Sequence, residues 1–238
     1  MKTLITTFSS NAKEAEEMAA VAKETGLVLM DAFHYRYHPV FLRAREIVDT
    51  GMLGTVRTVD AGFHIPVTDP NNIRNIYAMG GGVTMDIGCY PISWARHITG
   101  EEPEEIIATA EVGPPHVDTF LEAKFTFPSG IEATVSGDMR EGTKFRMDLK
   151  VTGDKGSMFI RNPLAPQSGH AIMLDIGSEQ TVETRDRRST YGYQLDAFIA
   201  AVEQGGSLYT GPEDAVNQMR TIDRCYEAAG LPLRGLEL

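Results

Sequence analysis

The residues best suited to chemistry lie between positions 80 and 96. Three consecutive glycines, Gly80 to Gly82, lead into a helical pattern in which an acid, Asp86, and a phenol, Tyr90, stand four residues apart. Residues i and i+4 share one face of a helix, so both side chains are expected to point into one pocket. A carboxylate beside a phenol is suited to acid–base chemistry, and Gly88 would let another backbone or a ligand approach closely. The alternative is structural: Asp86 is a buried, hydrogen-bonded carboxylate and Tyr90 is a packing residue.

The composition excludes several classes of protein. The chain has 238 residues and a formal net charge of −11, which argues against a nucleic-acid partner because such binding rests on basic patches. No apolar run approaches the roughly 20 residues of a membrane helix, and the N-terminus lacks the long apolar region of a signal peptide. The two cysteines, Cys89 and Cys225, have no metal-ligand spacing and are expected to be reduced. We therefore expect a cytoplasmic protein that binds no nucleic acid, membrane or metal.

The elements before the Asp86 motif follow a strand–helix–strand pattern. A polar cluster at residues 9–11 precedes helical spacing over residues 12–25, which Gly26 ends. Residues 4–8 and 27–33 are short apolar runs and are predicted as strands, the second of them buried. A further helix begins at Pro39, and the helix that carries the motif spans residues 82–99.

The rest of the chain has the pattern of a meandering sheet. Short strand-like runs are separated by turns rich in glycine and proline, and consecutive strands joined by short turns pair in antiparallel fashion. The predicted strands span residues 56–65, 105–112, 119–127, 132–139, 145–152 and 156–161, with weaker candidates at 172–175 and 180–183, and helices at 192–203 and 212–229 follow. The predicted fold class is α+β, a large, mostly antiparallel open sheet with helices on one face, preceded by the strand–helix–strand segment.

Several segments, taken in chain order, resemble the Gfo/Idh/MocA family of NAD(P)-dependent oxidoreductases. They are residues 14–18, 32–39, 54–57, 80–90, 193–198 and 219–230, which match in one register. The family joins a Rossmann domain to an α/β domain whose open sheet commonly forms a dimer interface, with the catalytic pocket between the two domains. The tyrosine in the motif is similar to that of glucose–fructose oxidoreductase and dimeric dihydrodiol dehydrogenase.

The resemblance implies roles for particular residues. Tyr90 would pass the proton, while a nicotinamide passes the hydride, and Asp86 would orient the phenol. His38, Arg74 and Tyr191 would contact the substrate, and Arg36 would lie near the edge of the cofactor. The alternatives are a surface or capping role for His38, a surface ion pair for Arg36 and packing for Tyr191.

One departure from the family pattern bears on the cofactor. The family places a Glu-Lys-Pro motif before the helix that begins near Ser9, and Thr6 falls on the position of its lysine. The glycine-rich phosphate turn and its acidic ribose partner also have no counterpart in the sequence. We therefore expect residues 1–34 to be a remnant of a dinucleotide-binding domain and residues 35–238 to be the substrate and dimerisation domain. NAD or NADP is the family's cofactor, and this chain alone is expected to bind neither.

The sequence thus predicts an NAD(P)-dependent oxidoreductase of sugars or related polyols by family resemblance, inactive or cofactor-deficient as this truncated chain. Whether the chain is an enzyme by itself stays open. The alternatives are a non-catalytic dimeric domain that binds a small polyhydroxy ligand or acts as a scaffold, and a vestigial truncated product. A homodimer through the sheet is expected, and the substrate and the choice between NAD and NADP are left open.

Overall fold

A computed structural model describes residues 8–113 and 116–236, and its central feature is a sheet of eight strands. The strand order is β2-β3-β4-β1-β5-β6-β7-β8. The first strand, β1 (Val56–His64), lies between β4 and β5 and pairs with β4 in parallel, while every other neighbouring pair is antiparallel. The remaining strands are β2 (Glu105–Gly113), β3 (Val117–Thr126), β4 (Glu132–Asp138), β5 (Arg146–Gly153), β6 (Gly156–Arg161), β7 (Ala171–Ile176) and β8 (Glu179–Glu183).

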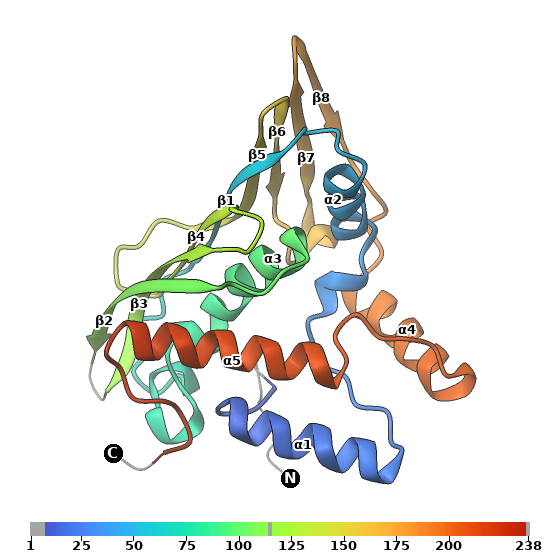
Figure 1. Cartoon of the computed structure of the whole chain (residues 1–238). Coiled ribbons are helices and arrows are strands. Elements are labelled where there is room, and N and C mark those ends of the chain that lie inside the picture. The colour runs from blue at the N-terminus through green and yellow to red at the C-terminus, as the bar shows by residue number, and fades with distance from the viewer. Residues whose placement is uncertain (1–7, 114–115, 237–238) are drawn as a thin grey trace.

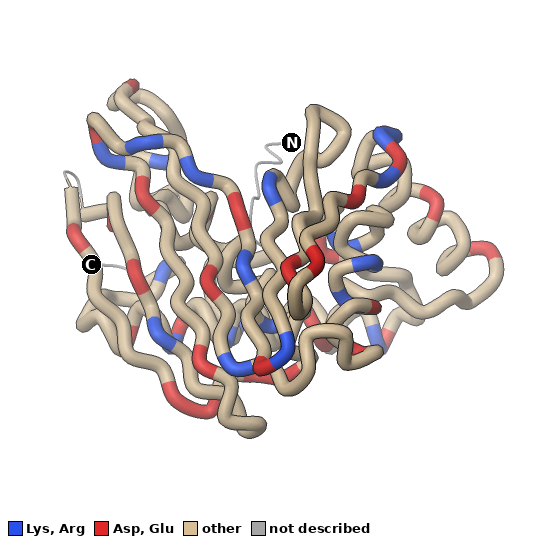
Figure 2. The backbone as a smooth tube through the Cα atoms, turned by 90° about the horizontal axis from the view of Figure 1, so that it is seen from above, with Lys and Arg blue, Asp and Glu red and all other residues tan. Residues whose placement is uncertain are grey.

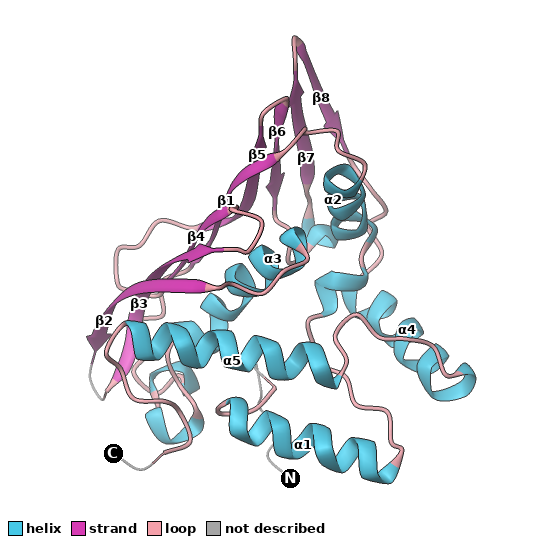
Figure 3. Ribbon diagram, in the orientation of Figure 1, coloured by secondary structure: helices cyan, strands magenta, loops and turns pink. Residues whose placement is uncertain are grey.

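The α-helices lie together on one face of this sheet (Figures 1 and 3). They are α1 (Ala12–Thr25), α2 (Pro39–Asp49), α3 (Cys89–Thr99), α4 (Thr190–Gln204) and α5 (Pro212–Ala228). Helix α3 packs against β1 and β4 at the centre of the sheet, and α5 packs against β2 and α1. The predicted α+β class and the antiparallel character of the sheet are confirmed, and the single parallel pair is an addition to it.

Local sequence explains where the first helices begin and end. Asn11 caps α1 by accepting a hydrogen bond from the Glu14 amide, and Gly26 ends it with a left-handed φ of 67°. Pro39 occupies the first turn of α2, where its missing N–H costs no hydrogen bond. These boundaries agree with the predicted ones, because capping residues act over only a few positions.

The core lies between the sheet and the helices that cover it. Trp94 on α3 is completely buried, as are Phe41 on α2 and Met219 on α5. On the sheet, β4 contributes Ala133 and Val135 at alternating positions, which is the period of a strand with one buried face. The core therefore fixes α3, the helix that carries Tyr90, against the middle of the sheet.

The prediction of a buried strand at residues 27–33 is wrong. The segment has no regular secondary structure and pairs with no strand among the described residues, and the Leu27 side chain is 70% exposed. A strand needs neighbouring backbone to satisfy its N–H and C=O groups, and no described strand lies beside this segment. The companion strand predicted at residues 4–8 falls almost entirely outside the described residues.

The predicted helix over residues 82–99 is interrupted. Residues Thr84–Gly88 form a π-helical turn, and the regular helix α3 begins only at Cys89. Such turns are rare and occur often at functional sites. The interruption places Asp86 on the π-helical turn and Tyr90 in the first turn of α3.

Candidate active site

The π-helical turn is held tightly against the sheet. A side chain added at Gly137 on β4 would come within 3.0 Å of the Gly88 Cα atom, so the two backbones meet where neither residue has a side chain. Helical rotation then directs Asp86 and Tyr90 to the same side of the turn. The sequence predicted the close approach at Gly88, and Gly137 supplies the second half of it.

Asp86 and Tyr90 line one cavity of about 490 Å³. Its walls come from β1, the loop after it, the π-helical turn and the segment before β7. The apolar lining residues include Phe63, Ile65, Val67, Ile87 and Leu164, and the polar ones include Thr68, Asp69, Asn72 and Arg74. The cavity therefore combines mainly apolar side chains with a small set of polar groups, which is the usual make-up of a small-molecule site.

Aromatic rings surround the Tyr90 side chain. Phe33 and Phe63 meet its ring edge to face, with centroids 5.4 Å and 6.1 Å away. Burial raises the pKa of the Tyr90 phenol well above its usual value, and neighbouring groups, Cys89 first and Asp86 among them, raise it further. Tyr90 is therefore protonated at neutral pH, the state in which it can donate its proton.

Arg74 and Asp86 form an ion pair on the wall of the same cavity. The Arg74 Nε donates to Asp86 Oδ2, and the Asp86 carboxylate is only 6% exposed. Asn72 holds Arg74 in turn, because its side-chain oxygen accepts from the Arg74 amide at 3.1 Å. Among the described residues, no hydrogen bond is recorded to Asp86 Oδ1, so this oxygen can accept one from a ligand.

The triple glycine before the π-helical turn does not form a phosphate cradle. The amides of Gly80, Gly81 and Gly82 donate to the carbonyls of Tyr77, Ile76 and Arg74, at 2.9 to 3.0 Å. A phosphate loop needs free amides that point at the ligand. Among the described residues no glycine-rich turn joins a strand to a helix in the manner of a dinucleotide site, so these residues do not fit the phosphates of NAD or NADP.

Comparison with known proteins identifies the family. The family model described as the GFO/IDH/MocA C-terminal domain matches residues 41–159. D-xylose 1-dehydrogenase (NADP(+)) 2 from Haloferax volcanii is 33% identical over 221 residues, which cover 90% of this chain and 67% of the relative. The chain belongs to the GFO/IDH/MocA family. The predicted resemblance is thereby confirmed.

Other members of the GFO/IDH/MocA family show the same relation. An inositol 2-dehydrogenase from Rhizobium meliloti is 26% identical, over 88% of this chain and 66% of the relative. The crystal structure of an aldose-aldose oxidoreductase from Caulobacter crescentus, complexed with glycerol, matches with a TM-score of 0.85 at 28% identity, over 93% of this chain and 68% of that one. The chain thus spans about two thirds of the length of these relatives, which are oxidoreductases of sugars and polyols.

Two of the residues predicted to contact the substrate, His38 and Tyr191, lie outside the cavity of Tyr90. His38 is completely buried at the start of α2, where its Nδ1 accepts from the Val40 amide at 3.1 Å. Tyr191 on α4 is 60% exposed, and its ring lies 4.1 Å from that of His34, centroid to centroid. Tyr191 lines a separate cavity of about 340 Å³. Of the three residues predicted to bind substrate, only Arg74 lies with Asp86 and Tyr90.

Arg36, predicted to lie near the cofactor, is enclosed by aromatic rings. Its guanidinium lies 4.7 Å from the ring centroid of Tyr209 and 5.3 Å from that of Phe41. These cation–π contacts give the side chain a packing role at the junction of α2 and the loop before α5.

Two buried titratable groups lie close to the Tyr90 ring. Burial lowers the pKa of His34 to about 4, and its ring centroid lies 6.5 Å from that of Tyr90. Burial, assisted by the negative charge of Asp214, raises the pKa of Asp31 to about 7. Asp31 is 3% exposed, and its Oδ2 has no hydrogen-bond partner among the described residues. Neither residue belonged to the predicted site, because burial of this kind depends on tertiary packing.

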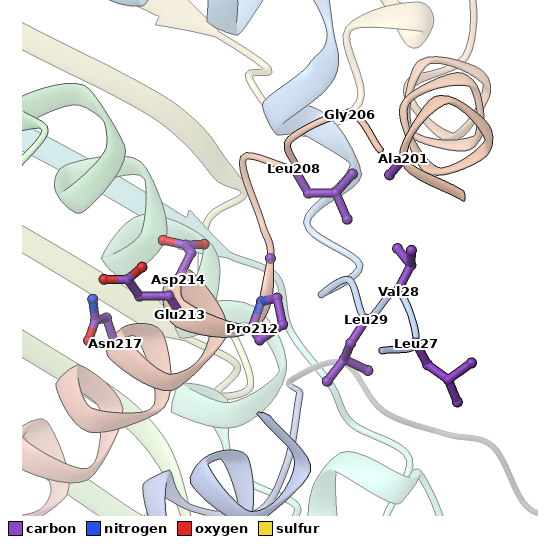
Figure 4. Close-up of a pocket in the computed structure, with 11 residues that line it drawn as sticks. Leu27, Val28, Leu29, Ala201, Gly206, Leu208, Pro212, Glu213, Asp214 and Asn217 are labelled. Atoms are coloured by element: carbon purple, nitrogen blue, oxygen red, sulfur yellow. The ribbon is translucent and has the colours of Figure 1, made fainter. Parts of the chain in front are cut away.

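A larger cavity, of about 520 Å³, lies elsewhere, between residues 27–29, the end of α4 and the start of α5 (Figure 4). Leu27, Val28 and Leu29 face it from one side, and Glu213 and Asp214 from another. It contains no cation and no phenol among its lining residues, so we assign the chemistry to the smaller cavity. The described residues also hold no cluster that could bind a metal ion and no helix long and apolar enough to cross a membrane.

Proposed function

We propose that this chain supplies the substrate site of a sugar or polyol oxidoreductase and that Tyr90 transfers the proton. The observation that carries the proposal is the convergence of Tyr90, Asp86 and Arg74 on one cavity. The sugar and polyol substrates named for the relatives support the substrate class. NAD or NADP is proposed as the cofactor by the same analogy.

In this proposal the substrate oxygen that gains or loses a proton lies next to the Tyr90 hydroxyl. The phenol is protonated at neutral pH, so it can donate to a carbonyl oxygen as that oxygen becomes an alcohol, and it takes the proton back in the opposite direction. Asp86 Oδ1 accepts from a neighbouring substrate hydroxyl and fixes its orientation. Arg74 holds Asp86 through Oδ2, so the carboxylate has one fixed position.

The charges around the cavity favour a neutral substrate. Arg74 is the basic residue among those that line it, and its charge is already paired with Asp86. Asp69 adds a second carboxylate, so a phosphate or carboxylate on the ligand would meet excess negative charge. The apolar wall, with Phe63 and Leu164, suits the C–H face of a sugar ring. We therefore propose an uncharged sugar or polyol rather than a sugar phosphate.

A ligand screen with matched variants tests this proposal. D-xylose, myo-inositol and their phosphates are titrated while the melting temperature is followed. We expect the neutral ligands to raise the melting temperature and Tyr90→Phe to weaken this binding about tenfold, the loss of one well-placed hydrogen bond. Tyr193→Phe removes the hydroxyl of a half-buried tyrosine on α4, which donates to Asp186, and serves as the control. Stabilisation by the phosphates alone, or equal effects of the two variants, would refute the assignment.

We also propose that residues 1–34 belong to a dinucleotide-binding domain. In support, residues 27–30 have no regular secondary structure and make no backbone hydrogen bond recorded among the described residues. Helix α4 adds a stripe of exposed apolar side chains, Tyr191, Leu195, Ile199 and Val202. Such surfaces are normally covered. Calorimetry with NAD(H) and NADP(H) tests the expectation that this chain alone binds them more weakly than about 100 μM. Tighter binding would overturn it.

A homodimer through the open face of the sheet is proposed as the assembly. Charged residues of both signs lie along the strands of the sheet (Figure 2). They are paired: Arg146 lies between Asp60 and Asp148, and Arg140 contacts Asp138. A surface that carries both signs can meet a second copy of itself. Light scattering tests this, with Ile107→Glu, a change at a 70% exposed position on β2, as the disrupting variant. A monomeric wild type would contradict the proposal.

A cytoplasmic location is proposed from the state of the cysteines. Cys89 and Cys225 are both free and buried, the usual condition in a reducing compartment. Cell fractionation would test the location directly.

A further inference from the structure

A second buried ion pair lies behind the candidate active site, and none of its atoms lines the cavity. Asp118, at the start of β3, is completely buried, and Arg234, in the segment after α5, is 1% exposed. The Arg234 Nη2 donates to Asp118 Oδ1. Burying two charges costs free energy that their mutual attraction seldom offsets in full. The contacts of the pair show which part of the structure it holds in place.

Arg234 binds the glycine loop that precedes the site. Its Nε donates to the Gly81 carbonyl at 2.9 Å, and its guanidinium lies between the rings of Tyr77 and Tyr226, 4.8 Å and 4.4 Å from their centroids. The Tyr77 hydroxyl donates in return to the Leu233 carbonyl at 3.1 Å. The segment after α5 is therefore joined to the loop that carries Arg74 at two separate points.

Asp118 binds the other side of the same loop. Its Oδ2 accepts from both the amide and the hydroxyl of Thr84, at 2.8 Å and 2.5 Å, at the first residue of the π-helical turn. Its Oδ1 also accepts from the Tyr226 hydroxyl at 3.1 Å. Since Asp86 lies on this π-helical turn, Asp118 fixes the backbone that presents it.

Arg74 and Asp86, the ion pair on the cavity wall, are thus held through the same glycine loop. The Gly82 amide donates to the Arg74 carbonyl at 2.9 Å, and the Asp86 amide donates to the Gly82 carbonyl at 3.2 Å. Gly82 has a φ of 133°, and a side chain there would overlap Asp118 Oδ1. The loop can therefore follow this path only with a glycine at position 82, where the backbone packs against Asp118.

We propose that Asp118 and Arg234 are positioning residues that set the geometry between Arg74 and Asp86. The segment after α5 acts as a clamp on the substrate site from behind. This inference rests on the proposed function for its significance in binding, while the clamp itself can be tested without any ligand. Neither residue touches the cavity, so they act through the glycine loop.

Amide hydrogen exchange measures the clamp directly. In Arg234→Lys the charge remains, but an ammonium cannot reach Gly81 and Asp118 with the planar guanidinium geometry. We expect the amides of Gly82, Thr84 and Asp86 to exchange at least about tenfold faster, while those of β5 and β6 exchange at wild-type rates. Tyr77→Phe, which removes only the bond to the Leu233 carbonyl, is the milder second variant and should act in the same direction.

Arg96→Lys is the matched control. Arg96 on α3 is equally buried, at 2% exposure, and its guanidinium binds Glu102, Asp214 and Gln218 rather than the glycine loop. We expect this control to leave the three loop amides within about twofold of the wild-type rates. The clamp is refuted if Arg234→Lys leaves those amides unchanged, or accelerates them only as much as β5 and β6.

A ligand measurement separates the clamp from the proposed function. With D-xylose as the probe, Arg234→Lys and Asp118→Asn should weaken binding about tenfold, and Arg96→Lys should leave it unchanged. Wild-type protein that binds neither D-xylose nor myo-inositol would count against the proposed function. The exchange experiment would still decide whether the clamp exists.

Discussion

The Asp31 carboxyl should make the stability of this protein fall as the pH rises. Its pKa is raised from 3.8 to about 7 in the folded protein, first by burial and then by the charge of Asp214. Between these two values the folded state holds a proton that the unfolded state has released. The contribution of Asp31 is therefore fully present below pH 4 and is lost as the pH rises through 7.

The size of the effect follows from the shift. A difference of about three units corresponds to about 4 kcal/mol at 1.36 kcal/mol per unit. Asp31→Asn removes the titration and leaves an amide in place of the carboxyl. The orphaned position of Oδ2 then holds an NH₂ group without a partner, a cost that does not depend on pH. Comparing two pH values cancels that cost.

Urea denaturation at pH 4 and pH 8.5 measures this difference. We expect Asp31→Asn, relative to the wild type, to be about 4 kcal/mol more favourable at pH 8.5 than at pH 4. Asp223→Asn is the comparison variant, because the pKa of Asp223 is raised only to about 6, and its side chain is less buried than that of Asp31. For that variant, the stability relative to the wild type should differ by less than about 2 kcal/mol between the two pH values, and the difference should arise between pH 4 and pH 6. Equal stability changes of Asp31→Asn at both pH values would refute the reasoning.

Two further predictions concern residues around the site. Burial lowers the pKa of His34 to about 4, so its contribution to folding stability is lost as the pH falls from 6.5 to 4. In thermal melts, His34→Asn should remove up to about 3 kcal/mol of this loss of stability in acid. An unchanged acid slope would contradict it. Gly82→Ala should destabilise by more than about 3 kcal/mol, because the new methyl group meets Asp118. Gly142→Ala is the control, because Gly142 also has a positive φ, 80°, but has open space around it. We expect it to lower the stability by about 1 kcal/mol. Equal losses of stability in the two variants would show that the Asp118 contact is unimportant.

Local patterns were sufficient for most of the elements. The helix from Ala12 to Thr25 follows from a capping asparagine, helical spacing and a terminal glycine, all within the helix or next to it. The strands of the sheet alternate and are separated by turn residues, so their positions were also predictable. The parallel pairing of β1 with β4 was not, because it joins strands separated by α3 and two further strands.

The failed strand at residues 27–33 shows a different limit. Its apolar run has the composition of a buried strand, but a strand exists only where another backbone pairs with it. Leu27 and Val28 are instead exposed, and the Asp31 amide bonds to the Thr210 carbonyl at 2.8 Å. Apolar composition alone supplies no pairing partner, and among the described residues no strand lies beside this segment.

The candidate site divides in the same way. That Asp86 and Tyr90 line one cavity was predictable, because only four residues separate them and their relation is local. The part that fixes them joins positions far apart in the sequence, Gly81, Asp118 and Arg234, through side-chain bonds to backbone. No spacing rule connects these positions, although the unusual combination of a buried arginine and a buried aspartate marks them once the fold is known.

The proposed proton-transfer site is formed without any dinucleotide-binding turn among the described residues, and this has a consequence for how the proposed enzyme would work. Tyr90, Asp86 and Arg74 are held by α3, β4 and the segment after α5, all within one packed unit. Under the proposed function their geometry therefore does not depend on a dinucleotide, and we expect a sugar to be oriented before the cofactor binds. If the binding of the sugar depended instead on the binding of the cofactor, the glycine loop would have to move when the cofactor binds. The buried pair of Asp118 and Arg234 opposes that movement, because opening the loop would leave two charges without partners in the interior.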